Sequence, residues 1–255
     1  MFISYSRVDS LFLQPCIAHC FFNQNVKSIT AYVNATASDF RKFNGGEVQR
    51  QVIAILPHPG FAGRSIDPDL MLLKLESKVV DITPLRINIQ SGVPAEKQRV
   101  TIIGLGSTTF GGSPSEKLLE AGVDIVGIDD CNDENSYQNI LQGDRQICAN
   151  AQGKGACQGD SGSPLLYRNG NGNLVQVGLT SFGRGCDDIQ LPPVYTRVSF
   201  YYQGWILPNL CKLASNPPQA CNTTTYKKST TTVQKPSPPI TRYPTLRSPA
   251  QRTQP

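Results

Sequence analysis

The chain has 255 residues, of which 39% are hydrophobic and 17% charged, and its formal net charge is +5. This length can bury a full core or two half-barrels, while no apolar run reaches the roughly 18–20 residues that a membrane span requires. The positive charge does not indicate nucleic-acid binding, because residues 212–255 hold seven Lys and Arg and no acid, which leaves a net of −2 elsewhere.

Short β-type segments dominate the first part of the chain. Residues 28–33, 48–56 and 70–75 are rich in apolar and β-branched side chains, and turns containing Gly, Pro and Asn separate them. This spacing is typical of all-β proteins, and no long helical period interrupts it. We expect residues 1–92 to form a partial N-terminal β-barrel.

A second β-rich part follows a polar linker at 91–98. We expect it to cover residues 93–211, with strands at 100–107, 121–128, 174–182 and 192–198. The aromatic-rich segment 200–210 predicts a C-terminal helix with Trp205 in the core. Pro208 is expected to limit the end of this helix, because proline cannot donate to a helical hydrogen bond.

The tail at 212–255 differs in composition from the rest of the chain. Of residues 213–255, 21 are Ser, Thr or Pro, and little in the segment can be buried. Such a composition predicts disorder and suits a stalk or O-glycosylation. Binding of the basic tail to a cell wall or an anionic glycan is the alternative function.

Chemistry is most strongly indicated by Gly155-Ala-Cys-Gln-Gly-Asp-Ser-Gly-Ser-Pro164, which sets Ser161 among glycines. A serine hydroxyl is a poor nucleophile unless a base removes its proton. Flanking glycines let the backbone bend and turn its N–H groups toward a developing oxyanion. A glycine-rich turn with an incidental serine is the alternative, since a bare Gly-Xaa-Ser-Xaa-Gly match is weak.

The candidates for the base and the acid lie upstream of Ser161. The chain has two histidines: His19 lies in Cys-Ile-Ala-His-Cys, and His58 lies between two prolines, where an extended structural loop is favoured. Asp69 begins Asp-Leu-Met-Leu-Leu-Lys-Leu, and Asp67 does not fit that register. Both motifs resemble those that carry the base and the acid in a known protease family, and on that resemblance we predict His19 as the base and Asp69 as the acid; a solvated turn carboxylate is the alternative for Asp69.

Together these motifs resemble those of the chymotrypsin-like (trypsin-fold) serine proteases, over roughly residues 11–211. The resemblance implies an all-β fold of two antiparallel six-stranded barrels, the first incomplete here. It also implies that Ser161 is the nucleophile, that His19 is the general base and that Asp69 orients His19. The N–H groups of Gly159 and Ser161 would form the oxyanion hole.

The same resemblance places a substrate-binding pocket and strand. Gly155 occupies the pocket floor, where trypsin-like members carry aspartate, so strict preference for Lys or Arg is not supported. The remaining expected substrate-binding residues are Ser181, Phe182, Gly183 and Pro193. Gly183 and Gly185 suggest open walls and an apolar P1 residue, Pro193 narrows the base, and Asp187 or Asp188 could add charge. No cofactor is implied, and too few acids cluster to predict calcium.

Eight cysteines indicate an oxidising compartment and therefore a secreted, extracellular protein. The resemblance pairs Cys131 with Cys148 and Cys157 with Cys186. Cys211 and Cys221 are close enough to form a small loop, whereas Cys20 lacks its usual partner and has only Cys16 nearby. The Cys16-His19-Cys20 cluster coincides with the predicted base, so we predict no metal site. Glycosylation patterns occur at Asn34 and Asn222.

The N-terminus departs from the family. No Ile-Val-Gly-Gly motif precedes His19, and residues 1–13 do not have the features of a signal peptide. In the family a new α-amino group pairs with the acid before the nucleophile, here Asp160, which is therefore expected to lack a partner and to let its loop relax. An incomplete sequence and a genuinely truncated homologue are the two interpretations.

The sequence thus predicts a secreted, monomeric serine endopeptidase acting on protein or peptide substrates and open to protein inhibitors. It predicts neither nucleic-acid binding nor a membrane span. A catalytically impaired homologue that binds or inhibits a partner is the main alternative, although all three triad residues are present. A third hypothesis, a wall-anchored structural protein, would explain only the tail at 212–255 and none of the other motifs.

Overall fold

The computed structural model describes residues 13–16, 18–20, 26, 29–39, 42, 45–62, 67–80, 82–186, 188–214 and 219–222. Most of the tail expected at 212–255 lies outside the described residues. The same holds for residues 1–12, for Asp187 and for the last two residues of the pattern at Asn222. Within the described part no helix is long and apolar enough to cross a membrane.

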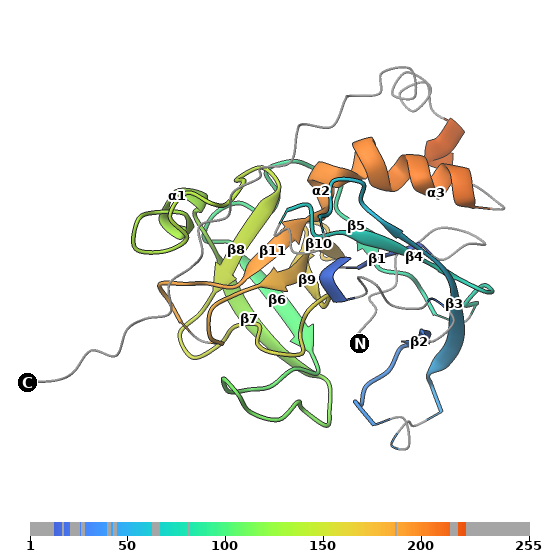
Figure 1. Ribbon diagram of the computed structural model, residues 1–255, viewed down its shortest axis with the longest axis horizontal. Coiled ribbons are helices and arrows are strands. Elements are labelled where there is room, and N and C mark those ends of the chain that lie inside the picture. Colours follow the sequence, from blue (N-terminus) through green and yellow to red (C-terminus); the bar gives the residue numbers. More distant parts are fainter. Residues whose placement is uncertain are drawn as a thin grey trace, which may run out of the picture.

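A four-stranded antiparallel sheet forms the first part of the fold (Figure 1). Its order is β1-β4-β3-β2, and its strands are β1 (Leu13–Cys16), β2 (Thr30–Val33), β3 (Val48–Pro57) and β4 (Met71–Leu75). The strands expected at 28–33, 48–56 and 70–75 are β2, β3 and β4, with ends that differ by one or two residues.

Strand β4 is buried on both of its faces. Because side chains alternate along a strand, Met71, Leu73 and Leu75 enter the core of the first sheet. Leu70 and Leu72 point the other way, into a cluster with Leu179, Val198 and the C-terminal helical segment. This double burial fixes the start of β4, and therefore the position of Asp69.

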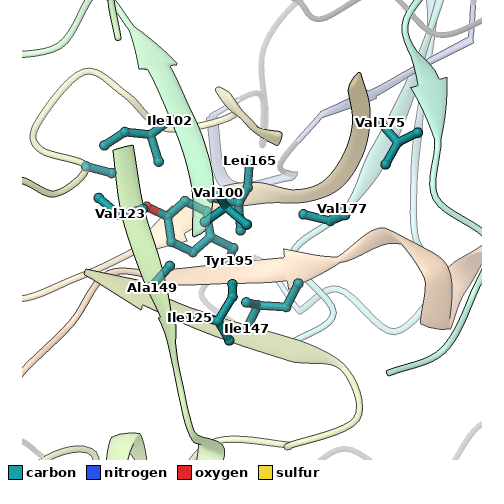
Figure 2. Close-up of a cluster of buried hydrophobic side chains, with 11 residues drawn as sticks. Val100, Ile102, Val123, Ile125, Ile147, Ala149, Leu165, Val175, Val177 and Tyr195 are labelled. Atoms are coloured by element: carbon teal, nitrogen blue, oxygen red, sulfur yellow. The ribbon is translucent and has the colours of Figure 1, made fainter. Parts of the chain in front are cut away.

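A closed barrel of six antiparallel strands forms the second part, as expected for the fold class. The order β11-β8-β7-β6-β9-β10 closes through an additional β10–β11 pairing. Valine, isoleucine and leucine side chains fill the barrel around the ring of Tyr195 (Figure 2). The strands are β6 (Arg99–Gly104), β7 (Leu119–Val126), β8 (Gln146–Asn150), β9 (Pro164–Arg168), β10 (Leu174–Phe182) and β11 (Val194–Arg197).

One short strand from the first part joins the second sheet. Strand β5 (Arg86–Ile87) pairs in parallel with β10, and the N–H of Asn88 donates to the carbonyl of Gln176 at 2.8 Å. The segment before the expected domain boundary near residue 92 therefore already contacts the barrel.

The C-terminal helical segment is longer than expected. It runs through α2 (Val198–Tyr201), the π-helical turn η4 (Tyr202–Ile206) and α3 (Leu207–Leu213). In the view of Figure 1, α3 lies above β4. The prediction that Pro208 limits this helix was wrong. Pro208 lies in the first turn of α3, directly after the wider π-helical turn η4, in which the N–H of Leu207 donates to the carbonyl of Tyr202, and the helix continues past it to Leu213.

Two further short helices are α1 (Ile128–Cys131) and the 3-10 turn at Gln219–Asn222. Disulfides hold both regions: Cys131–Cys148 ties α1 to β8, and Cys211–Cys221 ties α3 to the 3-10 turn.

Contacts beyond β5 also connect the first sheet to the barrel. Ala37 forms an antiparallel bridge with Lys117, and the N–H of Leu118 donates to the carbonyl of Thr36 at 2.8 Å. On another side, Nη1 of Arg145 lies 3.0 Å from Oδ2 of Asp67.

Candidate active site

His19 and Asp69 are brought together from distant parts of the first sheet region. His19 lies in the 3-10 turn Ala18–Cys20, which Ala18 anchors by complete burial, and Asp69 lies two residues before the start of β4. Nδ1 of His19 lies 2.7 Å from Oδ2 of Asp69, and the backbone N–H of His19 donates to Oδ1 at 3.0 Å. These two contacts fix both the position and the orientation of the imidazole.

Asp69 is 2% exposed and is held by groups from the barrel as well. Oγ of Ser181 donates to Oδ2 at 2.6 Å, and Oγ1 of Thr196 donates to the backbone carbonyl of Asp69 at 3.0 Å. A buried carboxylate is costly unless hydrogen-bonded, and the bonds from Ser181 and from the His19 N–H offset that cost. Ser181, expected to bind substrate, thus directs its hydroxyl to Asp69.

Contact with the Asp69 carboxylate makes the His19 imidazole more basic. Hydrogen bonding to Asp69 raises the pKa of His19 above its ordinary value, hydrogen bonding to Cys20 adds to the rise, and burial opposes both. Because an ionised carboxylate only accepts, the proton of neutral His19 sits on Nδ1. Nε2 is then left with a lone pair that can accept a proton, as a general base requires.

Ser161 lies in the turn between β8 and β9 and is partly exposed. Its loop is anchored to β10, since the N–H of Gly162 donates to the carbonyl of Thr180 at 2.9 Å and the N–H of Thr180 to that of Ser163 at 2.9 Å. Thr180 directly precedes Ser181, which bonds Asp69. In the described part of the chain the Ser161 hydroxyl forms no hydrogen bond, so the structure links Ser161 to His19 and Asp69 through β10.

Gly159 and Ser161 leave their backbone N–H groups available. Among the described residues neither group donates a hydrogen bond, although their neighbours Asp160, Gly162 and Ser163 all do. Gly159 has φ +94°, a conformation that side chains rarely adopt, and a Cβ there would lie 3.1 Å from Cα of Gly106. Glycine is therefore required for this turn of the backbone.

Asp160 has partners that the sequence did not suggest. Its Oδ1 accepts from the N–H of Gly106 at 2.8 Å and its Oδ2 from the N–H of Cys157 at 2.9 Å. Burial raises the pKa of Asp160, and the bonds from Cys157 and Gly106 oppose that rise. The expected relaxation of this loop is not seen, because backbone N–H groups satisfy the carboxylate.

The segment Gly104–Gly112 supports the loop further. The N–H of Ser107 donates to the carbonyl of Gln158 at 2.8 Å, and that of Gly111 donates to Oε1 of Gln158 at 3.3 Å. The sequence pattern predicted only a strand at Gly104 and Gly106. Their repeated glycines were the available signal, since a side chain at either position would overlap Asp160.

The expected pocket residues lie close together. A Cβ built on Gly155 would lie 2.6 Å from the carbonyl oxygen of Cys186 and 3.3 Å from Cγ of Pro193, and one built on Gly183 would lie 3.4 Å from Cα of Pro193. Phe182 packs edge-on against Tyr137, with ring centroids 5.7 Å apart. The disulfide Cys157–Cys186 joins the Ser161 loop to this region.

Cys20 is a free thiol in the structure. The sequence left open a bond from Cys20 to Cys16, and the structure does not form it. Within the described residues no group of three or more His, Cys, Asp or Glu could hold a metal ion.

His58 has a structural environment. Its ring lies 5.3 Å from that of Tyr201 and 5.0 Å from that of Trp205, and its Nδ1 accepts from the N–H of Gly60 at 3.1 Å. Burial lowers the pKa of His58 to about 4; Asp67 opposes and Arg145 adds to this shift. His58 therefore stays neutral at neutral pH.

Comparison with known proteins identifies the family. The trypsin family model matches residues 17–206. Trypsin epsilon of Drosophila erecta is 32% identical over 74% of this chain and 70% of its own length. The venom peptide isomerase heavy chain of Agelenopsis aperta is 32% identical over 76% of this chain and 82% of its own length. Trypsin-1 of Astacus astacus is 30% identical over 75% of this chain and 81% of its own length. The chain therefore belongs to the trypsin family of chymotrypsin-like serine proteases.

Proposed function

We propose that this chain is a secreted serine endopeptidase that uses Ser161, His19 and Asp69 as its catalytic triad. The contact that carries the proposal is the 2.7 Å bond from Nδ1 of His19 to the buried carboxylate of Asp69. It leaves Nε2 as the free basic atom, and membership of the trypsin family supports the interpretation of the Ser161 motif as the nucleophile loop.

The reaction begins when Nε2 of His19 accepts the proton of the Ser161 hydroxyl while Oγ attacks a peptide carbonyl carbon. Asp69 stabilises the imidazolium that forms. His19 then protonates the leaving amine, and an acyl-enzyme remains on Ser161. Water gives a proton to His19 as it attacks the acyl carbon, and His19 returns that proton to Oγ of Ser161 as the acyl bond breaks and the second product leaves.

The N–H groups of Gly159 and Ser161 serve as the oxyanion hole. Two observations support this role: neither group has an acceptor within the described residues, and the neighbouring Asp160 is held by Gly106 and Cys157. Donors fixed before the reaction stabilise developing charge without reorganising. Loss of one such donor typically lowers kcat by about 10²–10³.

Substrates are proteins or peptides, held by the backbone of Ser181, Phe182 and Gly183 as an added β-strand. Strict preference for Lys or Arg at P1 is not expected, because Gly155 replaces an acid at the pocket floor. Three disulfides support an oxidising, extracellular location. The exposed Asn34 in Asn-Ala-Thr is a glycosylation acceptor compatible with it.

Covalent labelling of the purified full-length chain with a serine-reactive fluorophosphonate tests the proposal. We expect mass spectrometry to find the label on Ser161, and we expect His19→Ala to abolish it. His58→Asn is the matched control, since it removes the other histidine and leaves the proposed base in place. A folded chain that labels no serine, beside a fully labelled control protease, would overturn the proposal in favour of an inactive binding homologue.

A further inference from the structure

Pro193 places its ring between two glycines of the expected substrate pocket. A Cβ on Gly155 would lie 3.3 Å from Cγ of Pro193, and a Cβ on Gly183 would lie 3.4, 3.7 and 3.9 Å from its Cα, Cβ and Cγ. These glycines come from separate segments, the loop before Ser161 and the end of β10. The pyrrolidine ring therefore lies against both glycines, where the family resemblance places the P1 side chain.

We infer that Pro193 closes the deep end of this pocket and restricts the enzyme to substrates with a small, uncharged P1 residue such as alanine. The inference rests on the proposed function, and it narrows the apolar preference expected from the sequence.

The ring cannot move aside. Pro193 is buried, and its carbonyl accepts from the N–H of Ala149 at 3.2 Å. The preceding residue is fixed as well, since the hydroxyl of Tyr137 donates to the carbonyl of Pro192 at 2.9 Å. The next residue, Val194, is fully buried and pairs with Phe182. Proline itself allows little backbone rotation.

The floor beyond the ring is also filled. A Cβ on Gly155 would lie 3.1 Å from Oδ1 of Asn150 and 2.6 Å from the carbonyl of Cys186. Asn150 is 6% exposed and held in place, because its Nδ2 donates to the carbonyl of Asp188 at 2.8 Å and its Oδ1 accepts from the N–H of Ala151 at 2.9 Å. The floor therefore consists of neutral atoms with fixed partners.

The printed contacts of the nearby described carboxylates, those of Asp188 and Asp160, direct them to backbone N–H groups. Oδ1 of Asp188 accepts from the N–H groups of Gln190 at 2.9 Å and Leu191 at 3.3 Å, so it closes its own turn. Asp160 is directed toward Gly106 and Cys157. Burying a lysine or arginine charge without a partner is costly, whereas a methyl group needs neither depth nor a counter-charge.

Peptide p-nitroanilides that differ only in a P1 alanine, phenylalanine or lysine test the inference on the full-length enzyme. We expect kcat/KM for alanine to exceed that for the other two by at least about tenfold. Two variants open the pocket: Pro193→Gly and the milder Pro193→Ala, which removes only the outer ring atoms. We expect each to raise kcat/KM for the phenylalanine substrate, relative to that for the alanine substrate, by about tenfold or more. Neither change should raise kcat/KM for the lysine substrate.

Pro192→Gly is the matched control, because it loosens the same turn without opening the pocket, and its P1 preference should stay that of the wild type. Fluorophosphonate labelling of Ser161 is measured on every sample. A labelled wild-type enzyme that prefers phenylalanine or lysine overturns the inference alone, as does an unchanged preference in labelled, folded Pro193 variants. Folded wild-type protein that is neither labelled nor active overturns the proposed function together with the inference.

Discussion

Ser181 donates a hydrogen bond of 2.6 Å to Oδ2 of Asp69, the same carboxylate oxygen that lies 2.7 Å from Nδ1 of His19. Ser181 belongs to the barrel, whereas Asp69 and His19 belong to the first sheet region. One oxygen atom therefore links the two parts of the fold at the proposed triad. Because Ser181 and His19 both bond this oxygen, each hydrogen bond weakens the attraction of the carboxylate for the other donor.

Ser181→Ala should raise the pKa of His19 further, because Asp69 then directs more of its charge to the imidazole. A hydrogen bond to a charged group contributes about 1.5–3 kcal/mol, so we expect kcat/KM at neutral pH to fall by about tenfold or more. The acid limb of the pH–rate profile should move to higher pH. Ser136→Ala, a buried serine whose Oγ has no partner in the described part of the chain, is the control. An unmoved limb would contradict the expected charge transfer.

Gly106→Ala should disable the oxyanion loop while the fold persists. A Cβ on Gly106 would lie 2.5 Å from Cγ of Asp160, so the carboxylate must leave the N–H groups that hold it. We expect kcat to fall by about 10²–10³ with little change in KM, measured by steady-state kinetics. Gly170→Ala, where a Cβ meets nothing within 4 Å, should behave as wild type. Full activity in Gly106→Ala would contradict the role assigned to Asp160.

His58 should make stability depend on pH. Its folded pKa of about 4 lies below the ordinary value of 6.5, so the unfolded chain binds a proton first as pH falls. Stability is therefore lost between about pH 6.5 and 4. His58→Phe, which keeps an aromatic ring, should lose about 1–2 kcal/mol less than wild type between pH 7 and 5 in urea unfolding. Equal losses in both proteins would contradict this.

The disulfide Cys211–Cys221 should stabilise the chain without affecting catalysis. It closes a loop of sequence separation 10, for which reduced chain entropy predicts about 2–3 kcal/mol. We expect the double change to serine to lower the free energy of unfolding by that amount and to leave kcat at 25 °C unchanged. The loop lies outside the residues that contact Asp69. A fall in kcat with unchanged stability would reverse this assignment.

Side-chain motifs made much of the site predictable from the sequence. His19 and Asp69 stand in short patterns, and β10 has its predicted bounds because hydrophobic residues run through it without Pro or a charge. The partners of Asp160 could not be predicted in this way, because they are backbone N–H groups that every residue except proline carries. Only the absence of Cβ at Gly104 and Gly106 encodes them.

Backbone geometry also explains the errors. Pro208 was expected to limit the helix, yet the π-helical turn η4 precedes it and α3 continues beyond it to Leu213. Strand β5 was not predicted, because two residues are too few to show a period. The position of the Pro193 ring between Gly155 and Gly183 was only partly predicted, since a proline in the sequence does not reveal where its ring points.

In the proposed mechanism, catalysis depends on the junction between the sheet and the barrel. His19 and Asp69 stand on one side of it, Ser161 on the other, and the bridge of Ala37 to Lys117 and the pair of Asp67 with Arg145 align the two. A displacement of about 1 Å can cost a hundredfold in rate while leaving each hydrophobic core intact. Mild heating or dilute urea should therefore abolish proteolytic activity before any spectroscopic sign of unfolding. Cooling should restore that activity within the time that the sheet and the barrel need to realign.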